Sequence, residues 1–424
     1  MKFHVLCLLC ALVVGAARPA GAAEKLAPGA AVEVVPAVAV AEGVIEKRPG
    51  GPTIGGRPVS PAEMRVTHPA GVRVEVVASG LEAPWDLAWT PDGRMFVTER
   101  PGRVRVIAGN GHLAPAPWIT FDVARTGEAG LMGMAVDPNF PVSPWLYFAM
   151  TVENAGGDLE NRVVRVREES GRAGRQEVIL DQLPGGRVHD GCQLAFGPDG
   201  KLYITTGETW KKEIAQDLAN LGGKILRLDA DGSIPADNPF GPESPVWSLG
   251  HRNPQGLAFD PSNGRLWATE HGPSGEWWGV RGNDELNLIA AGKNYGWPIA
   301  VGAPGLAGYV DPVLVFPKRH LPPAGVVVYS GRLVPAWAGN LFLASLRGET
   351  LVRVVLDQET RTRPIAVERL FETDFGDGLH GRLRAVGEGP DGALYFGTSN
   401  RDGRGDPAPE DDRIFRVVGA GTGG

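Results

Sequence analysis

Short apolar segments, each introduced by a polar turn, recur along the chain. In each unit Pro, Asp and Gly set a turn, and a run of aromatic, Leu and β-branched residues follows it. The six units are TPDGRMFVTER at Thr90, DPNFPVSPWLYFAMT at Asp137, GPDGKLYITTGE at Gly197, DPSNGRLWATEHG at Asp260, VPAWAGNLFLASLRG at Val334 and GPDGALYFGTSN at Gly389. Almost no amphipathic helical pattern separates them. The pattern therefore predicts an all-β protein.

The spacing of these units indicates a repeat architecture. Successive turns are separated by 47, 60, 63, 74 and 55 residues, measured between Pro91, Pro138, Pro198, Pro261, Pro335 and Pro390. A four-stranded blade takes about 40 to 50 residues, so each interval holds one blade and its loops. We expect a six-bladed β-propeller of four-stranded antiparallel blades over residues 70–420. A β-sandwich would leave the regular repeat unexplained.

The N-terminal residues predict export. Lys2 precedes an apolar stretch from Val5 to Ala17, and small residues follow up to Ala23. This is typical of a secretory signal peptide over residues 1–23, and the stretch is shorter than the about 20 residues of a membrane-spanning helix. Residues 24–69, rich in Ala, Val, Pro and Gly, are predicted to form an extended or partly ordered tether. We expect a periplasmic or secreted protein without an integral membrane segment in its mature chain.

Charge and cysteine content narrow the function classes. The formal net charge is -7, and nothing indicates nucleic-acid binding, which concentrates Lys and Arg on one face. Cys7 and Cys10 lie in the predicted signal peptide, so the mature chain keeps Cys192 alone and forms no intrachain disulfide. We expect Cys192 to be a small buried residue rather than a nucleophile.

Closure of a propeller predicts where polar residues gather. Equivalent strands end on the same rim, so the polar residues that follow each repeated strand are expected to approach one another. Taken alone, each of them is better explained as a residue that caps a strand or faces solvent. The candidates are Glu99, Glu208, His271, Arg347 and Asn400.

Two loops carry residues suited to chemistry. In G-G-R-V-H-D-G, His189 has a side chain that could take a proton from a substrate hydroxyl, although a lone histidine is more often structural. In G-H-R-N-P, Arg252 and Asn253 precede Pro254, which keeps the segment extended. A guanidinium suits carboxylates and negative charge developing on oxygen, or else a surface ion pair.

A third loop contains residues that could bind a hard cation such as Ca²⁺. Pro273 offers a carbonyl oxygen without an N–H, and Asp284 and Glu285 offer carboxylates, the ligand types that Ca²⁺ takes. The spacing is not that of an EF-hand, so the calcium signal is weak when taken alone.

Together these motifs resemble the soluble quinoprotein sugar dehydrogenases, the pyrroloquinoline-quinone (PQQ) dependent glucose, aldose and sorbosone dehydrogenase-like family. The resemblance covers about Gly71 to Val418, and it is carried by G-H-R-N-P-Q-G-L, by D-E-L-N-L-I with G-K-N-Y-G-W-P, and by G-R-L-R-A-V. It implies a six-bladed propeller with a calcium-bound PQQ over the rim. It also implies oxidation of the C1 hydroxyl of aldose sugars to lactones by hydride transfer to PQQ, with electrons passing to a separate acceptor.

The resemblance implies roles for individual residues. His189 corresponds to the general base that deprotonates the anomeric hydroxyl. Arg252 corresponds to the arginine that stabilises negative charge on the quinone oxygens, and Asn253 to its neighbour that contacts the cofactor. Gly272 and Pro273 correspond to the carbonyl ligands of the calcium that holds and polarises PQQ.

Further positions follow from the same resemblance. Arg382 and Arg384 correspond to an arginine pair that binds the cofactor's carboxylates, a task suited to guanidinium groups. Arg347 stands where the glucose enzymes have lysine. Glu285 and Tyr295 correspond to positions that bind a structural calcium in some relatives.

Two departures bear on the site. Glu128 occupies a cofactor-binding position where glutamine is expected, and its charge would repel a PQQ carboxylate unless it is protonated or paired. The segment S-G-E-W-W-G-V-R-G resembles an insertion, in which Trp277 and Trp278 either form part of a sugar platform or pack the loop.

Two other functions remain open at this point. A calcium-dependent propeller lactonase would also use a rim histidine, but it has no need for a ring of arginines. A non-catalytic sugar-binding propeller would keep the fold alone, and fold by itself does not decide function. The preferred sugar, the electron acceptor and the oligomeric state do not follow from the sequence.

Overall fold

The computed structural model describes residues 46–419, apart from residues 48, 57–58, 60–62, 70, 317–320 and 374–377. Contacts divide the chain into Met1–Val34 and Val35–Gly424, and all described residues belong to the second unit. The predicted signal peptide and residues 24–45 of the predicted tether lie outside the described residues.

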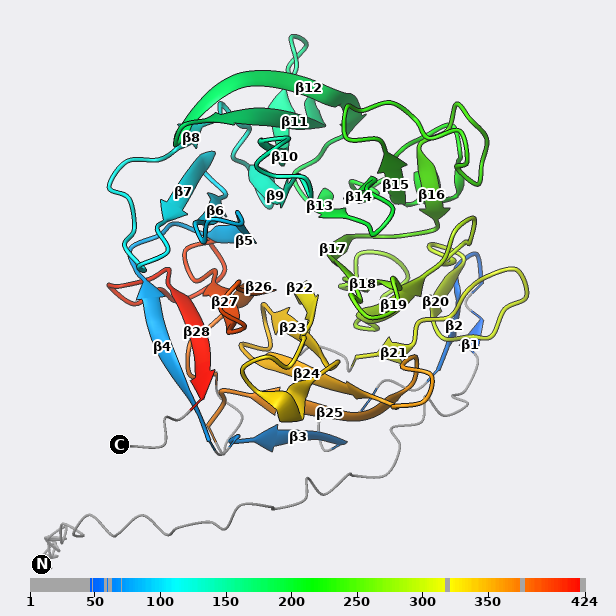
Figure 1. Cartoon of the computed structure of the whole chain (residues 1–424). Coiled ribbons are helices and arrows are strands. Elements are labelled where there is room, and N and C mark those ends of the chain that lie inside the picture. The colour runs from blue at the N-terminus through cyan, green and yellow to red at the C-terminus, as the bar shows by residue number, and fades with distance from the viewer. Residues whose placement is uncertain are drawn as a thin grey trace, which may run out of the picture. The chain divides into compact units, whose positions relative to one another are not determined.

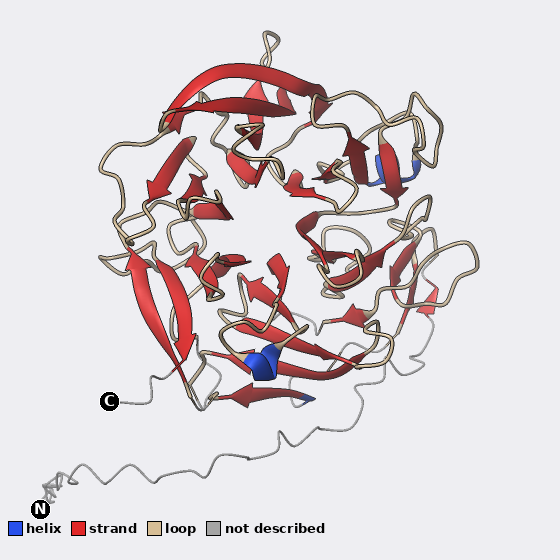
Figure 2. Cartoon of the chain, viewed as in Figure 1, coloured by secondary structure: helices blue, strands red, loops and turns tan. Residues whose placement is uncertain are grey.

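The described residues form seven sheets (Figures 1 and 2). They also contain two short 3₁₀ helices, Lys212–Gln216 and Pro335–Trp337. The predicted all-β class is confirmed. Six of the sheets contain four antiparallel strands that pair in a simple order.

The first three sheets run in chain order. One has β5 (Pro84–Trp89), β6 (Met95–Glu99), β7 (Arg103–Ile107) and β8 (Ile119–Thr120). The next has β9 (Leu131–Val136), β10 (Trp145–Glu153), β11 (Leu159–Glu169) and β12 (Arg172–Pro184). The third has β13 (Gly191–Phe196), β14 (Leu202–Thr206), β15 (Lys224–Leu228) and β16 (Val246–Leu249).

The fourth sheet omits β20, and each of the last two large sheets adds a strand from the beginning of the described residues. One has β17 (Pro254–Phe259), β18 (Leu266–Glu270), β19 (Glu285–Ile289) and β21 (Leu314–Val315). The next has β22 (Pro323–Val328), β23 (Leu341–Ser345), β24 (Leu351–Leu356) and β25 (Pro364–Leu370), with β3 (Met64–Thr67) added in parallel. β26 (Leu383–Glu388), β27 (Leu394–Thr398) and β28 (Ile414–Gly419) pair with β4 (Val72–Ala78). The small seventh sheet has β1 (Glu46–Lys47), β2 (Thr53–Gly55) and β20 (Ala300–Gly302).

The first strands of the six larger sheets contact one another in a closed cycle, β5, β9, β13, β17, β22, β26 and back to β5. Figure 1 shows these strands surrounding a common centre, with later strands farther out. The fold is a β-propeller. The strand predicted after each repeated turn is the second strand of each of these sheets, as in β14 and β18.

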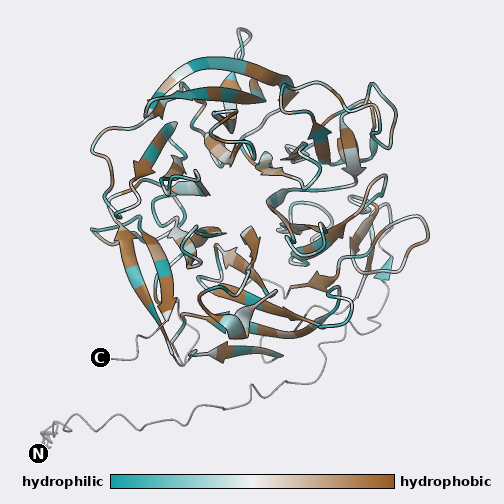
Figure 3. Cartoon of the chain, in the orientation of Figure 1, coloured by the Kyte–Doolittle hydropathy of each residue, from teal (hydrophilic) through white to brown (hydrophobic). Residues whose placement is uncertain are grey.

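Apolar side chains fill the space between neighbouring sheets. One core cluster joins Phe96 to Phe148, and another joins Phe342 to Phe396. Figure 3 shows the corresponding apolar segments along the strands. The first strands approach so closely that a Cβ on Gly256 would lie 2.2 Å from the carbonyl oxygen of Ala324. Glycine is therefore required there by close backbone approach.

Every pairing of a first strand with its second strand contains a register shift. In all six sheets the shift falls at the start of the first strand, as between Gly191 and Leu194 in β13. Such bulges bend a strand and re-aim its side chains, and they are frequent beside active sites. The residues at these strand starts are thus directed differently from those of a regular ladder.

Candidate active site

Most of the predicted site residues lie on loops at one end of the first strands, whereas Glu285 begins β19 and Arg384 lies in β26. Gly191 at the start of β13 pairs with Thr206 at the end of β14, and Pro254 at the start of β17 pairs with Glu270 at the end of β18. Residues just before a first strand and just after a second strand therefore meet at the same end. We call this end the site rim.

His189, Glu208 and Arg252 form a hydrogen-bonded chain on the site rim. The Nδ1 atom of His189 contacts Oε1 of Glu208, and its Nε2 lies 3.1 Å from Nη2 of Arg252. Arginine can only donate, so Nε2 is the acceptor and Nδ1 carries the proton that Glu208 accepts. This fixes the tautomer in which Nε2 is the basic atom, as a general base requires.

Burial sets the protonation of this chain. His189 is 7% exposed, and burial, followed by the charge of Arg252, lowers its pKa to about 2. Burial raises the pKa of Glu208 to about 7, although Arg252 opposes that shift. At neutral pH the imidazole is therefore neutral, and the group that titrates near neutrality is Glu208.

Arg252 is held on several sides. Its backbone N–H donates to Glu270, its Nη1 donates to the carbonyl oxygen of His271 at 2.9 Å, and its Nη2 contacts Glu276 from the predicted insertion. The Nδ1 atom of His251 lies 3.0 Å from the other oxygen of Glu270. In G-H-R-N-P the histidine thus supports the carboxylate that positions the arginine.

Glu128, the departure noted in the sequence, is paired. Its Oε1 accepts from Nη1 of Arg404 at 2.6 Å, and its Oε2 accepts the backbone N–H of His189 at 3.2 Å. Burial opposes its ionisation, but Arg404, followed by the imidazoles of His189 and His271, lowers its pKa to about 2. The carboxylate is thus charged and neutralised by a neighbouring arginine.

The other predicted arginines differ in their settings. Arg382 donates twice to Asp402, at 3.0 and 2.8 Å, and Arg384 donates to Gln255 at 2.7 Å. Burial lowers the pKa of Arg384 to about 10. Arg347 is exposed in the turn after β23. Arg384 and Arg382 are therefore built into the rim, whereas Arg347 lies at its surface.

Several buried polar atoms near this chain have no hydrogen-bond partner within the described part of the molecule. They are Arg100 Nε, Asp190 Oδ2, Gln193 Oε1, Arg252 Nε, Asn253 Nδ2 and His271 Nε2. Buried polar groups are normally paired, so an unpaired group calls for an explanation such as a ligand. Asn253, a predicted cofactor contact, is fully buried with this amide nitrogen unpaired.

Residues of the predicted calcium sites also form contacts with the protein. The carbonyl oxygen of Pro273 accepts from Gly282 N–H at 2.8 Å, and Gly272 N–H donates to Asp284 at 2.9 Å. The Tyr295 hydroxyl donates to the Leu288 carbonyl at 2.7 Å. No group of three or more His, Cys, Asp or Glu that could hold a metal occurs in the described ranges.

Glu285 lies beside another carboxylate, that of Glu270. It pairs across the strands with Glu270, and burial, followed by the charge of Glu270, raises its pKa. Cys192 is fully buried, and burial raises the pKa of its thiol, as expected for a packing residue.

Sequence reasoning placed Glu208 on the rim but did not assign it to His189, and it overlooked Glu276, Gln255 and Arg404. Glu208 ends the third repeated unit, so its position carried a signal. The others bond to partners between 24 and 276 residues away, which no local pattern reveals. Glu99, another rim candidate, is instead paired with Arg103.

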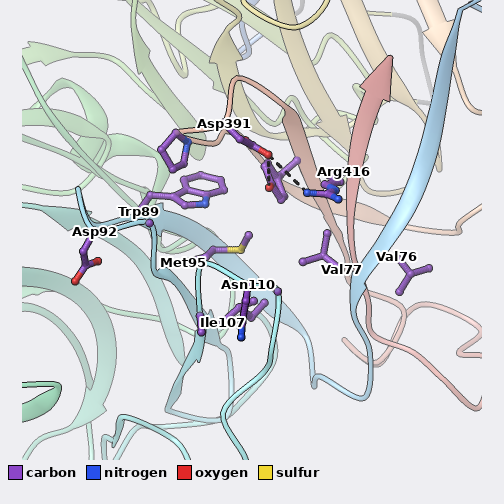
Figure 4. A pocket seen from close by; sticks show the side chains of 15 residues that line it. Val76, Val77, Trp89, Asp92, Met95, Ile107, Asn110, Asp391 and Arg416 are labelled. Carbon is purple, nitrogen blue, oxygen red and sulfur yellow. Dashed lines mark hydrogen bonds and ion pairs between the residues drawn. The ribbon is translucent and has the colours of Figure 1, made fainter. Parts of the chain in front are cut away.

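Two cavities lie outside the His189 chain. One, of about 630 Å³, is lined by Trp89, Tyr395, Asp391 and Arg416 among others (Figure 4). It lies where β5 turns into β6, at the end of the sheet opposite the site rim. The second, of about 600 Å³, is lined by the loop after β27, including Asn400.

Comparisons with known proteins identify the family of this chain. The family model for glucose/sorbosone dehydrogenase matches residues 81–406. The aldose sugar dehydrogenase YliI of Escherichia coli is 33% identical over 357 residues, which is 79% of this chain and 92% of that protein.

Among the described residues, no helix is long and apolar enough to cross a membrane.

Two solved structures are similar over the propeller. One, from Thermus thermophilus and assigned as an oxidoreductase (glucose dehydrogenase), is 47% identical with a TM-score of 0.73, covering 82% of this chain and all of that one. The PQQ-bound aldose sugar dehydrogenase of Streptomyces coelicolor is 36% identical with a TM-score of 0.71, covering 82% of this chain and 99% of that one. This chain therefore belongs to the glucose/sorbosone dehydrogenase family of oxidoreductases.

Proposed function

We propose that this protein is an exported, PQQ-dependent aldose sugar dehydrogenase that oxidises the C1 hydroxyl of its substrate to a lactone and passes electrons to an external acceptor. The observation that carries the proposal is the His189 chain, which presents a neutral imidazole with Nε2 as acceptor beside a fixed arginine. Membership of the family and the signal-like residues 1–23 support the class and the export.

His189 is the proposed general base. Glu208 holds the Nδ1 proton and stabilises the positive charge that the imidazole gains when Nε2 takes a proton from the anomeric hydroxyl. Arg252 lies at the same nitrogen and is placed to stabilise negative charge that develops on an acceptor oxygen.

The site fits PQQ by the chemistry of its donors. A group with three carboxylates needs cations, and buried or rim-based Arg252, Arg382 and Arg384, with exposed Arg347, supply them. The unpaired Asn253 Nδ2 is a further donor that a ligand would satisfy. Glu128 adds an acid, but Arg404 neutralises it. When bound, PQQ supplies the hydride acceptor.

Calcium is proposed at the carbonyls of Gly272 and Pro273, where a Lewis acid would polarise the cofactor. The Pro273 carbonyl already accepts one N–H, and a carbonyl oxygen has a second lone pair for a cation. Glu285 and Tyr295 are the proposed ligands of a structural calcium, and loss of a proton from buried Glu285 would be favoured by that charge.

We also propose that the propeller has six blades. The six cyclically contacting first strands support this count, and the seventh sheet, β1-β2-β20, is then an attachment outside the blades. The tether and propeller boundaries at residues 69 and 70 belong to the same proposal.

The proposal is tested by titrating metal-free protein with PQQ, with and without Ca²⁺, and then measuring dye reduction on a panel of aldoses. We expect stoichiometric binding and calcium-dependent reduction. Absence of PQQ binding would overturn the cofactor assignment, and lactone cleavage by protein never exposed to PQQ would support a hydrolase instead.

The role of His189 is tested by His189→Ala. We expect retained PQQ binding and turnover lower by about 10²–10⁴-fold, the usual contribution of a positioned general base. Unchanged turnover would remove His189 from that role. Val142→Ala is a suitable control because Val142 is exposed, at a turn between β9 and β10. His251→Ala is not suitable because His251 contacts Glu270, which positions Arg252.

A further inference from the structure

An exposed tryptophan stands beside the proposed base. The Trp210 ring lies 5.2 Å from the His189 ring, measured between centroids, and Trp210 is 52% exposed. Within the described part of the chain it is the one Trp or Phe side chain that is exposed. An exposed aromatic ring beside the proposed base offers apolar surface to a bound ligand, and removing that surface from water would be favourable.

The backbone that presents Trp210 is strained. Thr209 and Trp210 have φ values of +47° and +69°, a left-handed conformation that non-glycine residues rarely adopt. Two hydrogen bonds hold the turn, from Thr209 N–H to the His189 carbonyl at 3.2 Å and from Lys211 N–H to the Glu208 carbonyl at 2.8 Å. Strain of this kind persists mainly at functional sites, where the surrounding structure enforces it.

The insertion supports the ring from behind. Trp277 lies 5.2 Å from Trp210 and 5.6 Å from the buried Trp297. The same loop contacts Arg252 through Glu276, so one segment positions both the aromatic surface and the catalytic arginine. Trp277 is partly buried in this cluster, whereas Trp210, at 52% exposed, presents its most accessible indole surface.

We propose that Trp210 is a saccharide platform that stacks against the apolar C–H face of a pyranose ring and holds the substrate beside His189. Aromatic rings supply a large, stiff apolar surface with little side-chain entropy to lose, which suits a sugar's alternating apolar faces and polar edges. This inference rests on the proposed function and names the residue that determines how the sugar is held.

The test uses methyl α-D-glucopyranoside, a sugar whose blocked anomeric position prevents oxidation. Its dissociation constant is measured by ligand-observed NMR with the protein after incubation with PQQ and Ca²⁺. We expect Trp210→Ala to weaken binding by about tenfold, which corresponds to about 1.4 kcal/mol and lies within the range of an aromatic contact. Trp210→Phe should lose about threefold or less because the stack is retained.

Trp89→Ala is the matched control. Trp89 forms a comparable aromatic pair with Tyr395 at 5.2 Å, but it lines the cavity at the opposite end of the sheet. We expect Trp89→Ala to bind methyl α-D-glucopyranoside with the same dissociation constant as the unmodified protein. Equal binding by Trp210→Ala and the unmodified protein, or no binding by the unmodified protein, would overturn the platform.

Turnover separates the platform from a packing role. With D-glucose as substrate, a platform predicts a higher KM for Trp210→Ala, whereas loss of packing on His189 alone would lower kcat and leave the dissociation constant of the glucoside unchanged. If the unmodified protein reduces no dye with any aldose, the proposed function fails, and a Trp210-dependent dissociation constant still supports the platform.

Discussion

At the scale of single residues, the site depends on which group titrates near neutral pH. His189 is the proposed general base, but burial and Arg252 keep its imidazole neutral across the physiological range. Glu208 is the group whose pKa lies at about 7. When Glu208 gains a proton, it no longer stabilises the imidazolium formed during catalysis. Activity should therefore fall as the pH drops through about 7.

The pH dependence of kcat/KM tests this assignment, because that ratio reports ionisations of the free enzyme. We expect an acidic limb with a midpoint near 7. Glu208→Gln should remove the limb and lower kcat by about 10²-fold or more, since an amide cannot stabilise the imidazolium. A limb that survives unchanged in Glu208→Gln would show that another group titrates.

At the scale of elements, the first strands set the spacing of the site. Their bulges fall at the ends that carry His189 and Arg252, and their glycines allow neighbouring strands to approach. At Gly256 a Cβ would meet the Ala324 carbonyl oxygen at 2.2 Å and Thr269 Oγ1 at 2.4 Å. The first of these is backbone of the next first strand and cannot move aside without displacing that strand.

Gly256→Val should therefore lower the free energy of unfolding by about 1–3 kcal/mol, the usual cost of overpacking a core. Denaturant unfolding measures this. Gly419→Ala in β28, where a Cβ would meet nothing within 4 Å, should change stability by less than about 0.5 kcal/mol. Equal effects of the two substitutions would contradict the close-approach argument.

At the scale of the whole folded unit, the propeller is closed by pairing a strand from the beginning of the propeller sequence with a strand from its end. β4 pairs with β28 from Val72↔Gly419 to Ala78↔Ile414, so the last sheet takes its outer strand from the beginning of the fold. This pairing covers an edge that would otherwise expose unpaired backbone groups. β3 is likewise added to the edge of the sheet that ends with β25.

Two truncations test the closure. A chain that begins at Ser79 should lose cooperative thermal unfolding, because β28 then lacks its partner and Val74 no longer packs against the last sheet. A chain that begins at Gly71 keeps β4 and should still unfold cooperatively, at a lower temperature owing to the loss of β3. Similar melting curves for the two chains by circular dichroism would contradict the proposed role of β4.

Local sequence was enough to determine the class of fold and the positions of the second strands. Turn residues and β-branched or aromatic runs act over a few residues, so their pattern predicts strands such as β14 and β18 directly. The motifs around His189 and Arg252 likewise predicted which loops carry the proposed site, because their residue types are unusual in turns.

Only the tertiary structure determines which side chains of the candidate site pair with one another. Glu208 with His189, Glu128 with Arg404 and Arg384 with Gln255 meet because strands distant in sequence share a rim, and nothing local specifies those contacts. The same holds for the addition of β3 and β4 to late sheets, since strand pairing depends on which edges the folded chain leaves open. Burial then sets the charges of His189 and Glu208, because the desolvation that shifts a pKa exists only once the surrounding sheets have packed.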